Sequence, residues 1–312
     1  MEQVKQAVQA RLKELQFYSP YNILRNLDMQ KQQVFLLKKF EPWYKEQEGF
    51  SVFTSEQSGQ HYHFLYQHLS WDSQYFSYPT YKLFTVVFTD FTFDGLAAAT
   101  EAFKAHLFQN GKAYCFIDIP AEDIVLVQAL TAAGFRLTET RLTYYHDQVK
   151  TFDYDRFPVR AAEATDIEAL RKVASQSRND YDRYHADVFF APAQADDYLA
   201  TYAEACVNGL CDTVLVPAEE NLPADAFLAI SRLQHDAEEL ETRMARVVLT
   251  AVGPACKGWH VKLVAETLQY AKAHHCDYVL MTTQATNRAV FRTSEKLGFK
   301  LGATTHILAA QL

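Results

Sequence analysis

The sequence predicts a mixed α/β fold with a mixed β-sheet in two similar halves, and three observations support this. Short apolar strands alternate with amphipathic helices along the chain. The segment AEDIVLVQALTAAGFRL (residues 121–137) has a counterpart in QATNRAVFRTSEKLGFKL (residues 284–301), and each ends a helix with Gly-Phe. A polar stretch that contains Pro158 separates the two halves.

The first half is expected to open with helix and loop and to continue as strands and helices. In order, these are helix then loop in residues 1–60 with a break at SEQSGQ (55–60), an alternating strand at 61–71, an apolar strand at 81–89, a helix at 96–108, a buried strand at 113–119 and a closing strand at 141–147.

The polar segment at residues 150–166 is the best candidate for a boundary, because Thr165 and Asp166 are N-cap residues that begin a new helix. We therefore expect one unit at residues 1–155, with extra N-terminal helices, and a second at 156–312. The second half should contain helices at 167–175, 195–207, 261–274 and 288–297, strands at 213–218, 226–233, 245–252 and 278–283, a last strand, and a solvated hairpin loop at 235–242.

The two halves match at a constant offset. Residues 114–137 match residues 278–301, which lie 164 positions later, without a gap. Upstream, VVFT (86–89) matches VVLT (247–250) after a slip of three residues. Convergence is the alternative explanation, since Gly is common after helices, but the ungapped length favours duplication of one α/β unit.

Composition and charge limit the classes of function. The 312 residues are 49% hydrophobic and 22% charged, which is typical of a globular protein with room for two domains. A formal net charge of -8 argues against a non-specific binder of polyanions, so we expect no nucleic-acid partner. No window approaches the roughly 20 apolar residues that span a bilayer, and the start is an amphipathic helix. We expect a cytoplasmic protein with free thiols and no membrane partner.

The loop that follows the strand at 245–252 is a candidate anion site. The strand ends in Val252-Gly253-Pro254, the loop carries Lys257 and Gly258, and a long helix follows. The unpaired N–H groups at a helix N-terminus suit a phosphate or pyrophosphate. An ordinary strand-to-helix loop is the alternative, because many such turns contain one Gly and one Lys.

The second half resembles the GNAT-family N-acyltransferases. The family has a loop that reads Gln/Arg-x-x-Gly-x-Gly/Ala and a later helix that begins with Asn and ends Tyr-Glu-Lys-x-Gly-Phe. The matching residues are Gly258, Asn287, Glu295, Lys296, Gly298 and Phe299. The sequence departs from the pattern at Ala255, His260 and Ser294, which stand where the family has Gln/Arg, a small residue and Tyr.

The resemblance implies an enzyme that transfers an acetyl group from acetyl-CoA to an amine, without a metal. It assigns the strand to the pantetheine arm, the loop to the pyrophosphate, and the later helix to the thioester region. The implied acetyl-CoA residues are Leu249, Thr250, Val252, Lys257, Gly258, Trp259, His260, Val261, Asn287 and Phe291.

The proton transfers are less determined by the sequence. Ser294 occupies the position of the family's usual acid, and a hydroxyl is a poorer acid than a phenol, so another group or water is an open alternative. Glu241, which precedes the central strand, and Asp187 are candidates for the base or for holding the amine. The alternative for Glu241 is an ordinary solvated acid.

Two further segments resemble dTDP-fucosamine acetyltransferase and its relatives, namely LSWDSQYF (69–76) and DRYHADVFF (182–190). This implies an amino sugar on a nucleotide carrier as acceptor, contacted by Arg183 and His185. A polar loop with aromatic packing is the alternative for those residues. The competing functions are acetylation of a protein or small amine, and a non-catalytic GNAT-like protein that binds acyl-CoA or acts as a scaffold; a homodimer is left open.

The first half is expected to have lost coenzyme binding. Residues 90–96 lack a glycine-rich phosphate loop, and Asp123 stands at the position of Asn287. A carboxylate there would repel a phosphorylated ligand. We expect this half to pack, extend the sheet and shape the acceptor cleft.

Overall fold

The structure is a computed structural model that describes residues 1–177 and 179–311, and it contains two compact units. Unit 1 comprises Met1–Arg141 and Thr304–Leu312, and unit 2 comprises Leu142–Ala303. The sequence placed the boundary later, after residue 155. The segment before that point belongs to unit 2 because Val149 and Phe152 are buried in its core.

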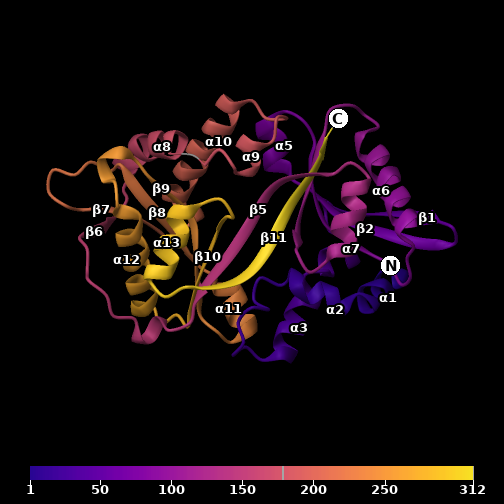
Figure 1. The fold of residues 1–312 in the computed structure, drawn as a ribbon, viewed down its shortest axis with the longest axis horizontal. Helices are drawn as coiled ribbons and strands as arrows, with labels where there is room; N and C mark the ends of the chain where they lie inside the picture. The colour runs from indigo at the N-terminus through magenta and orange to yellow at the C-terminus, as the bar shows by residue number, and fades with distance from the viewer. Residues whose placement is uncertain (178, 312) are drawn as a thin grey trace. The chain divides into compact units, whose positions relative to one another are not determined.

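Unit 1 begins with short helices and continues as an α/β unit (Figure 1). Its elements are α1 (Glu2–Ala10), α2 (Leu12–Leu15), α3 (Met29–Lys38), α4 (Glu41–Tyr44), β1 (Phe50–Gln57), β2 (Gln60–His68), α5 (Ser70–Phe76), β3 (Thr80–Val87), α6 (Phe93–Phe108), β4 (Tyr114–Pro120), α7 (Ile124–Ala132) and most of β5 (Arg136–His146).

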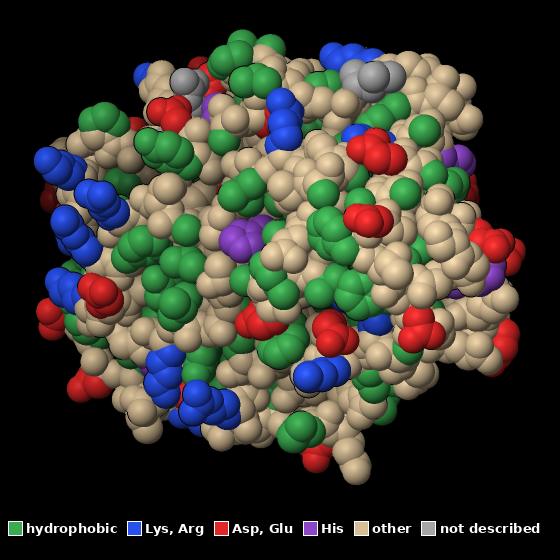
Figure 2. Space-filling model, turned by 45° about the vertical axis from the view of Figure 1, so that its right-hand side comes forward, with side chains coloured by type: hydrophobic (Ala, Val, Ile, Leu, Met, Phe, Trp, Pro, Cys, Tyr) green, Lys and Arg blue, Asp and Glu red, His purple; other side chains and the backbone are tan. Residues whose placement is uncertain are grey.

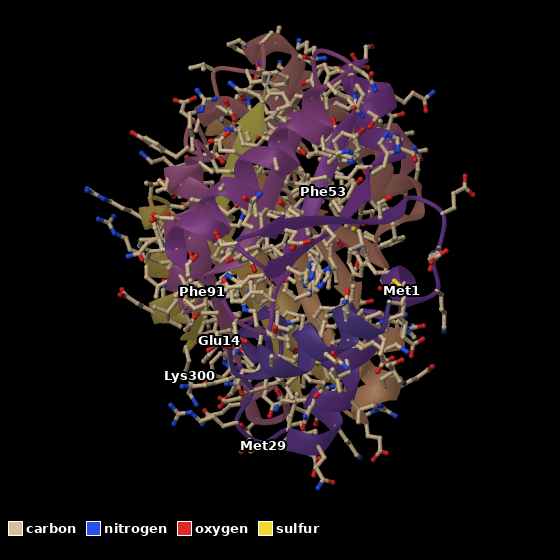
Figure 3. The ribbon with its side chains drawn as sticks, turned by 90° about the vertical axis from the view of Figure 1, so that its right-hand side faces the viewer. Met1, Glu14, Met29, Phe53, Phe91 and Lys300 are labelled. Atoms are coloured by element: carbon tan, nitrogen blue, oxygen red, sulfur yellow. The ribbon has the colours of Figure 1, made fainter. Side chains whose placement is uncertain are left out.

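The strands of unit 1 follow the order β1-β2-β3-β4-β11-β5, in which the C-terminal strand β11 (Lys300–Gln311) contributes its part from Thr304 onward. One face of the sheet, with Phe64, Leu83 and Ile117, packs on α6 and α7. The other face, with Leu65 and Val87, packs on the N-terminal helices. In Figure 3 these helices, marked by Glu14 and Met29, lie below the strand that carries Phe53.

Unit 2 repeats the alternation of strands and helices. Its elements are β6 (Val159–Ala161), α8 (Ile167–Gln176), α9 (Arg183–Ala186), α10 (Pro192–Ala205), β7 (Thr213–Pro217), β8 (Ala226–Arg232), α11 (Gln234–Leu240), β9 (Met244–Val252), α12 (Trp259–Ala273), β10 (Tyr278–Gln284) and α13 (Arg288–Lys296).

The sheet of unit 2 runs β5-β10-β9-β8-β7-β6 and is covered on both faces. Alternate residues of each strand point to opposite faces, so Leu228 and Ile230 pack with α12 and α13, whereas Phe227 and Ala229 pack with α8 and α10. Figure 1 shows these two pairs of helices on opposite sides of the strands. Both faces are therefore apolar, as the sequence predicted for a mixed α/β fold.

Two predictions from the sequence are wrong. The stretch 235–242 was expected to be a solvated loop, but most of it forms α11. The end of the first sixty residues was expected to be loop, but Phe50–Gln57 forms β1. The expected break at SEQSGQ is present as the turn at Ser58 and Gly59 that leads to β2. In both segments the polar side chains indicate that the segment is exposed to solvent. They do not show whether the backbone is helix, strand or loop, because that depends on its hydrogen bonds.

The structure gives matching elements in the two units. Thr80, Tyr114, Ile124 and Arg136 begin β3, β4, α7 and β5, and the elements β9, β10, α13 and β11 begin 164 residues later in each case. The predicted slip of three residues is wrong, because the strand register aligns Leu83 with Val247 at the same offset of 164. Duplication itself stays a prediction.

The surface carries charges of both signs. Figure 2 shows acidic and basic side chains among hydrophobic ones on the face it presents, with Lys and Arg more frequent near its left edge. Among the residues the structure describes, no helix is both long enough and apolar enough to cross a membrane.

A buried carboxylate on α12 fixes the segment that enters unit 2. Glu266 accepts the backbone N–H of Phe157 at 2.7 Å and pairs with Arg156 at 3.0 Å. Its side chain is 2% exposed, whereas that of Arg156 is 70% exposed. The backbone bond therefore contributes more than the ion pair, which is screened by water.

We expect Glu266→Ala to lower the free energy of unfolding of unit 2 by about 1–2 kcal/mol, because it leaves the part-buried N–H of Phe157 without this partner. Arg156→Ala should cost less than about 1 kcal/mol, because that side chain is exposed. Urea unfolding of both variants measures the difference. Equal losses would show that the ion pair, not the backbone bond, is what matters.

Candidate coenzyme site

The parallel strands β9 and β10 separate part-way along their length. Their pairing runs from Met244↔Tyr278 to Val247↔Met281 and ends there, although β9 continues to Val252. On its other side β9 stays paired with β8 up to Val252. Residues 248–252 therefore present a backbone edge toward β10 that lies beyond the paired part of the two strands.

A β-bulge lies where the strands separate. The register on β8 shifts from Ala229↔Leu249 to Ile230↔Val247, which leaves Val248 as the extra residue of β9. A bulge bends its strand and redirects the backbone groups beside it. Predicted ligand residues Leu249, Thr250 and Val252 follow the bulge and are half-buried, and the Thr250 hydroxyl donates to the Phe227 carbonyl at 2.9 Å.

The free edge leads into the N-terminus of α12. Gly258 is the N-cap residue, with φ +89° and no side-chain cap, and an added Cβ would meet no atom within 4 Å. The first-turn N–H groups that follow, from Trp259 to Val261, have no carbonyl of their own helix to bond and carry the positive end of the helix dipole. This arrangement, with Lys257 beside it, suits an anionic group.

Asp225, which the sequence analysis missed, lies against the same loop. Its carboxylate accepts the backbone N–H of Ala255 at 2.8 Å. A Cβ added at Gly253 would come within 2.3 Å of its oxygens, so only glycine fits there. A carboxylate near the loop opposes an anionic ligand and takes one of the donors. No sequence pattern pointed to it, because Asp225 precedes a different strand.

Other predicted residues have mainly structural contacts. Asn287 caps α13 by accepting the N–H of Val290 at 3.3 Å. Phe291 packs beside Tyr144, with ring centroids 6.3 Å apart. Trp259 is buried in the core, and Lys262 lies 4.3 Å above its ring. These contacts hold α12 and α13 in place beside the free edge of β9.

Three polar side chains on these two helices are named together as the α12–α13 subsite: His260 on α12, and Thr293 and Ser294 on α13. His260 Nδ1 and Thr293 Oγ1 are 2.8 Å apart. His260 Nε2 and Ser294 Oγ are buried and have no hydrogen-bond partner among the residues described. Burial lowers the pKa of His260 to about 4, so the imidazole is neutral at pH 7. Each unpaired buried group costs about 1–3 kcal/mol, so these positions need an explanation.

Glu241 lies at the opposite end of β9. It precedes the first strand residue, Met244, and the strand from Met244 to the bulge at Val248 is about 13 Å long, which argues against direct proton transfer at that point. It lines a cavity of about 860 Å³ at the start of β9 and β10, together with Arg232, Arg243 and His275. Its backbone is left-handed, with φ +51°, because it ends α11.

The RYHAD segment is held by its own contacts. His185 lies between two acids, with Nδ1 2.7 Å from Asp182 and Nε2 3.0 Å from Asp196. Burial lowers the pKa of His185, but the hydrogen bonds and charges of the two acids outweigh it and raise the pKa overall. A ligand contact by His185 stays a prediction, and it requires one of these bonds to break.

Arg183 and Asp187 lie two residues before and two residues after His185, and both are buried. Arg183 donates to the Tyr184 hydroxyl, and its guanidinium lies 4.4 Å from the centre of that ring. Asp187 Oδ1 accepts the backbone N–H of Phe189 at 3.1 Å. The segment is thus ordered, and its roles toward an acceptor stay predictions.

Unit 1 has an equivalent of the space beside the free edge of β9, and we call this space the slot of each unit. Its parallel pairing ends at Leu83↔Ile117, and its bulge residue is Phe84, the positions that match Val247, Met281 and Val248. Here Arg11, at the junction of α1 and α2, fills the space beside the free strand end.

The contacts of Arg11 resemble those of a bound ligand. It donates to both Asp123 oxygens at 2.6 Å and to the carbonyl of Val86. Tyr18 donates a further bond to Asp123 at 2.8 Å. Arg11 and Asp123 are 4% and 2% exposed. Asp123 therefore belongs to an internal ion pair. That unit 1 binds no coenzyme stays a prediction.

Comparison with known proteins identifies the fold of this chain. No family model matches the chain, and no curated protein matches it. A GCN5-related N-acetyltransferase from Sphaerobacter thermophilus aligns with a TM-score of 0.58 at 10% identity, over 99% of this chain and 93% of its own. The chain has the fold of the GCN5-related N-acetyltransferases.

Two other solved structures are similar to this chain. A fungal multi-domain GH3 β-N-acetylglucosaminidase, described as having a GCN5-related glucosamine N-acetyltransferase region, gives a TM-score of 0.60 at 11% identity, over 97% of this chain and 37% of its own. A protein of unknown function from Staphylococcus epidermidis gives 0.53 at 13%, over 86% and 97%. The narrower resemblance to dTDP-fucosamine acetyltransferase has no counterpart among these and stays a prediction.

The site of this GNAT fold fits acetyl-CoA in most respects. The β9 edge beyond Val247, the uncapped α12 N-terminus and the open space at Gly258 offer backbone groups and room to a ligand. The α12–α13 subsite adds two buried polar atoms that have no partner among the described residues. Asp225 is the one feature that opposes this ligand. Among the described residues, no group of three His, Cys, Asp or Glu could hold a metal ion.

The Arg11–Asp123 pair gives a test of the filled slot. We expect Arg11→Leu to lower the free energy of unfolding by about 3–5 kcal/mol, because it leaves a buried carboxylate without its partner. Arg11→Leu combined with Asp123→Leu should recover at least half of this loss. Exposed Lys13→Leu is the control and should change stability by less than about 0.5 kcal/mol in the same urea titration. A double variant that is no better than the single one would contradict this.

The two histidines should respond to pH in opposite directions. The depressed pKa of His260 means that its contribution to stability is lost as pH falls from its ordinary pKa of 6.5 to about 4, on the order of 3 kcal/mol. The raised pKa of His185 means that its contribution is full below 6.5 and is lost as pH rises through the folded value. Urea unfolding of His260→Gln and His185→Gln at several pH values, each compared with the native chain, should show opposite slopes; parallel slopes would refute the assignment.

Proposed function

We propose that the chain is an N-acetyltransferase that moves an acetyl group from acetyl-CoA to a primary amine, with an amino sugar on a nucleotide carrier as the acceptor. One observation carries the proposal. The edge of β9 left open beyond Val247↔Met281 leads directly to the uncapped N-terminus of α12. A strand edge followed by an anion site suits a ligand that is an extended polyamide ending in a pyrophosphate.

The backbone would make most of the contacts in this proposal. N–H and C=O groups of residues 248–252 would pair with the amides of the pantetheine arm, as one strand pairs with another. The N–H groups of Gly258, Trp259 and His260 would hold the pyrophosphate. Acetyl-CoA would supply the activated acetyl thioester. A backbone N–H at the Val248 bulge would polarise the thioester carbonyl, which is the usual way that acyl transfer is accelerated.

The acceptor amine must lose a proton before it attacks, and the leaving sulfur must be stabilised. Ser294 is our candidate for the sulfur side, because its buried hydroxyl has no partner within the described chain. Asp187 is our candidate for holding the amine, since it is a buried carboxylate in the segment proposed to contact the acceptor. Glu241 precedes β9, at the end of the strand opposite the free edge, which makes it the weaker candidate for the base.

The amino-sugar acceptor rests on weaker support. One structural neighbour is described as containing a glucosamine N-acetyltransferase region. Arg183, beside an aromatic ring, is a residue type that binds phosphates of a nucleotide. Acetylation of a protein or another small amine would use the same coenzyme site.

A second candidate is a non-catalytic GNAT-like protein that binds acyl-CoA or acts as a scaffold. Asp225 favours it, because its carboxylate lies against the loop that would hold the pyrophosphate. Asp225→Asn removes the charge and keeps the shape of the side chain, so it measures how strongly this carboxylate opposes the pyrophosphate.

The test is acetyl-CoA binding followed by turnover. A ligand at about a hundred times its Kd stabilises by about 2.7 kcal/mol, which should raise the unfolding midpoint by about 5–10 °C. Acetyl transfer to UDP-linked and dTDP-linked amino sugars, glucosamine and a peptide amine then identifies the acceptor. Binding with no turnover on any amine favours the second candidate, and absence of binding contradicts both coenzyme roles.

We expect Asp225→Asn to tighten acetyl-CoA binding by about three- to tenfold, because it removes a like charge near the pyrophosphate. Isothermal titration at low and high salt measures this, and the gain should shrink as salt screens the charge. A weaker complex would mean that the Asp225–Ala255 bond, which shapes the loop, outweighs the charge.

A further inference from the structure

The matched positions of the two units provide an internal comparison for the α12–α13 subsite. Thr293 and Ser294 correspond to Ala129 and Leu130 at the offset of 164 residues, because α7 and α13 begin that far apart. The helices α6 and α12 begin 166 residues apart, but their buried positions keep the offset of 164, as Ala99 and Leu263 show, and at that offset His260 corresponds to Leu96. Leu96, Ala129 and Leu130 are all 0% exposed and belong to the hydrophobic core of unit 1. The same positions of one fold are thus apolar in one unit and polar in the other.

The apolar residues occur in the unit whose slot is filled by a side chain, and the polar residues occur in the unit whose slot is not. In unit 1 the slot is filled by Arg11, which bonds Asp123 and the Val86 carbonyl. In unit 2 the equivalent positions are Asn287 and Thr250, and no side chain of the described residues donates to the Thr250 carbonyl. Apolar packing therefore accompanies the filled slot, and unpaired polar atoms accompany the open strand edge.

The polar residues are not required by the packing of the fold. Unit 1 shows that Leu, Ala and Leu satisfy these positions with no buried polar atom left unpaired there. Unit 2 instead buries His260 Nε2 and Ser294 Oγ without partners, although both lie on helices that would accept apolar residues. Because apolar residues would fit these positions, the unpaired polar atoms found there indicate a ligand.

We propose that His260, positioned by Thr293, donates a hydrogen bond from Nε2 to an oxygen of the acyl-CoA ligand, and that Ser294 provides a second hydroxyl at the same subsite. The inference rests on the proposed function and names the side chains that would hydrogen-bond its coenzyme. The imidazole acts as a neutral donor, consistent with the burial that lowers its pKa, and no proton is transferred. Two parts of the ligand carry such oxygens, the pantetheine arm and the pyrophosphate.

Isothermal titration of CoA into the native chain, His260→Leu, Ser294→Ala and Thr293→Val tests the proposal. We expect His260→Leu to raise the Kd for CoA at least tenfold while leaving the unfolding temperature unchanged or higher. His274→Leu, at the other end of α12, is the matched control and should leave the Kd unchanged. Pantetheine and inorganic pyrophosphate as separate probes identify which part of the ligand His260 reads.

A second readout does not depend on affinity. The ¹⁵N resonance of His260 Nε2 should shift when CoA is added to the native chain. If His260 bonds the pantetheine arm, ATP at the same concentration should cause no such shift. CoA binding that is unaffected by His260→Leu would overturn this inference and leave the proposed function standing. Absence of CoA binding to the native chain would overturn both.

Discussion

The backbone hydrogen bonding of one parallel strand pair is the constraint on which the rest of the structure depends. In unit 2, β9 and β10 pair over four residues each, and their pairing ends at Val247, just before the bulge residue Val248. Buried backbone N–H and C=O groups are almost always bonded, so a strand that leaves its neighbour must find other partners. Unit 1 and unit 2 meet this requirement in different ways.

Unit 1 meets it with its own chain. The guanidinium of Arg11 bonds the Val86 carbonyl, and Asp123 neutralises the charge that this introduces. Phe88 lies 4.6 Å from the guanidinium and covers it. The N-terminal helices therefore do more than cover one face of the sheet, because they close the position that corresponds to Thr250 in unit 2.

Unit 2 leaves the edge open beside an uncapped helix and a group of polar side chains. That arrangement costs stability, since His260 Nε2 and Ser294 Oγ are buried without partners. Stability given up at one location is characteristic of functional sites, where the lost interaction is made with a ligand. Asp225 complicates the site, because it provides negative charge where the proposed coenzyme has negative charge too.

The sequence by itself determined the mixed α/β class, the positions of most strands and helices, and the matching Gly-Phe turns, because periodic burial and helix-ending glycines are local signals. It also indicated the loop at Gly258 and the helix at Asn287, whose residue types follow a family pattern. Only the tertiary structure decided the register that aligns Leu83 with Val247, the role of Arg11 and the place of Asp225. These depend on contacts between residues far apart in the chain: Arg11 meets Asp123 across 112 positions and Asp225 meets Ala255 across 30, so no local pattern could predict them.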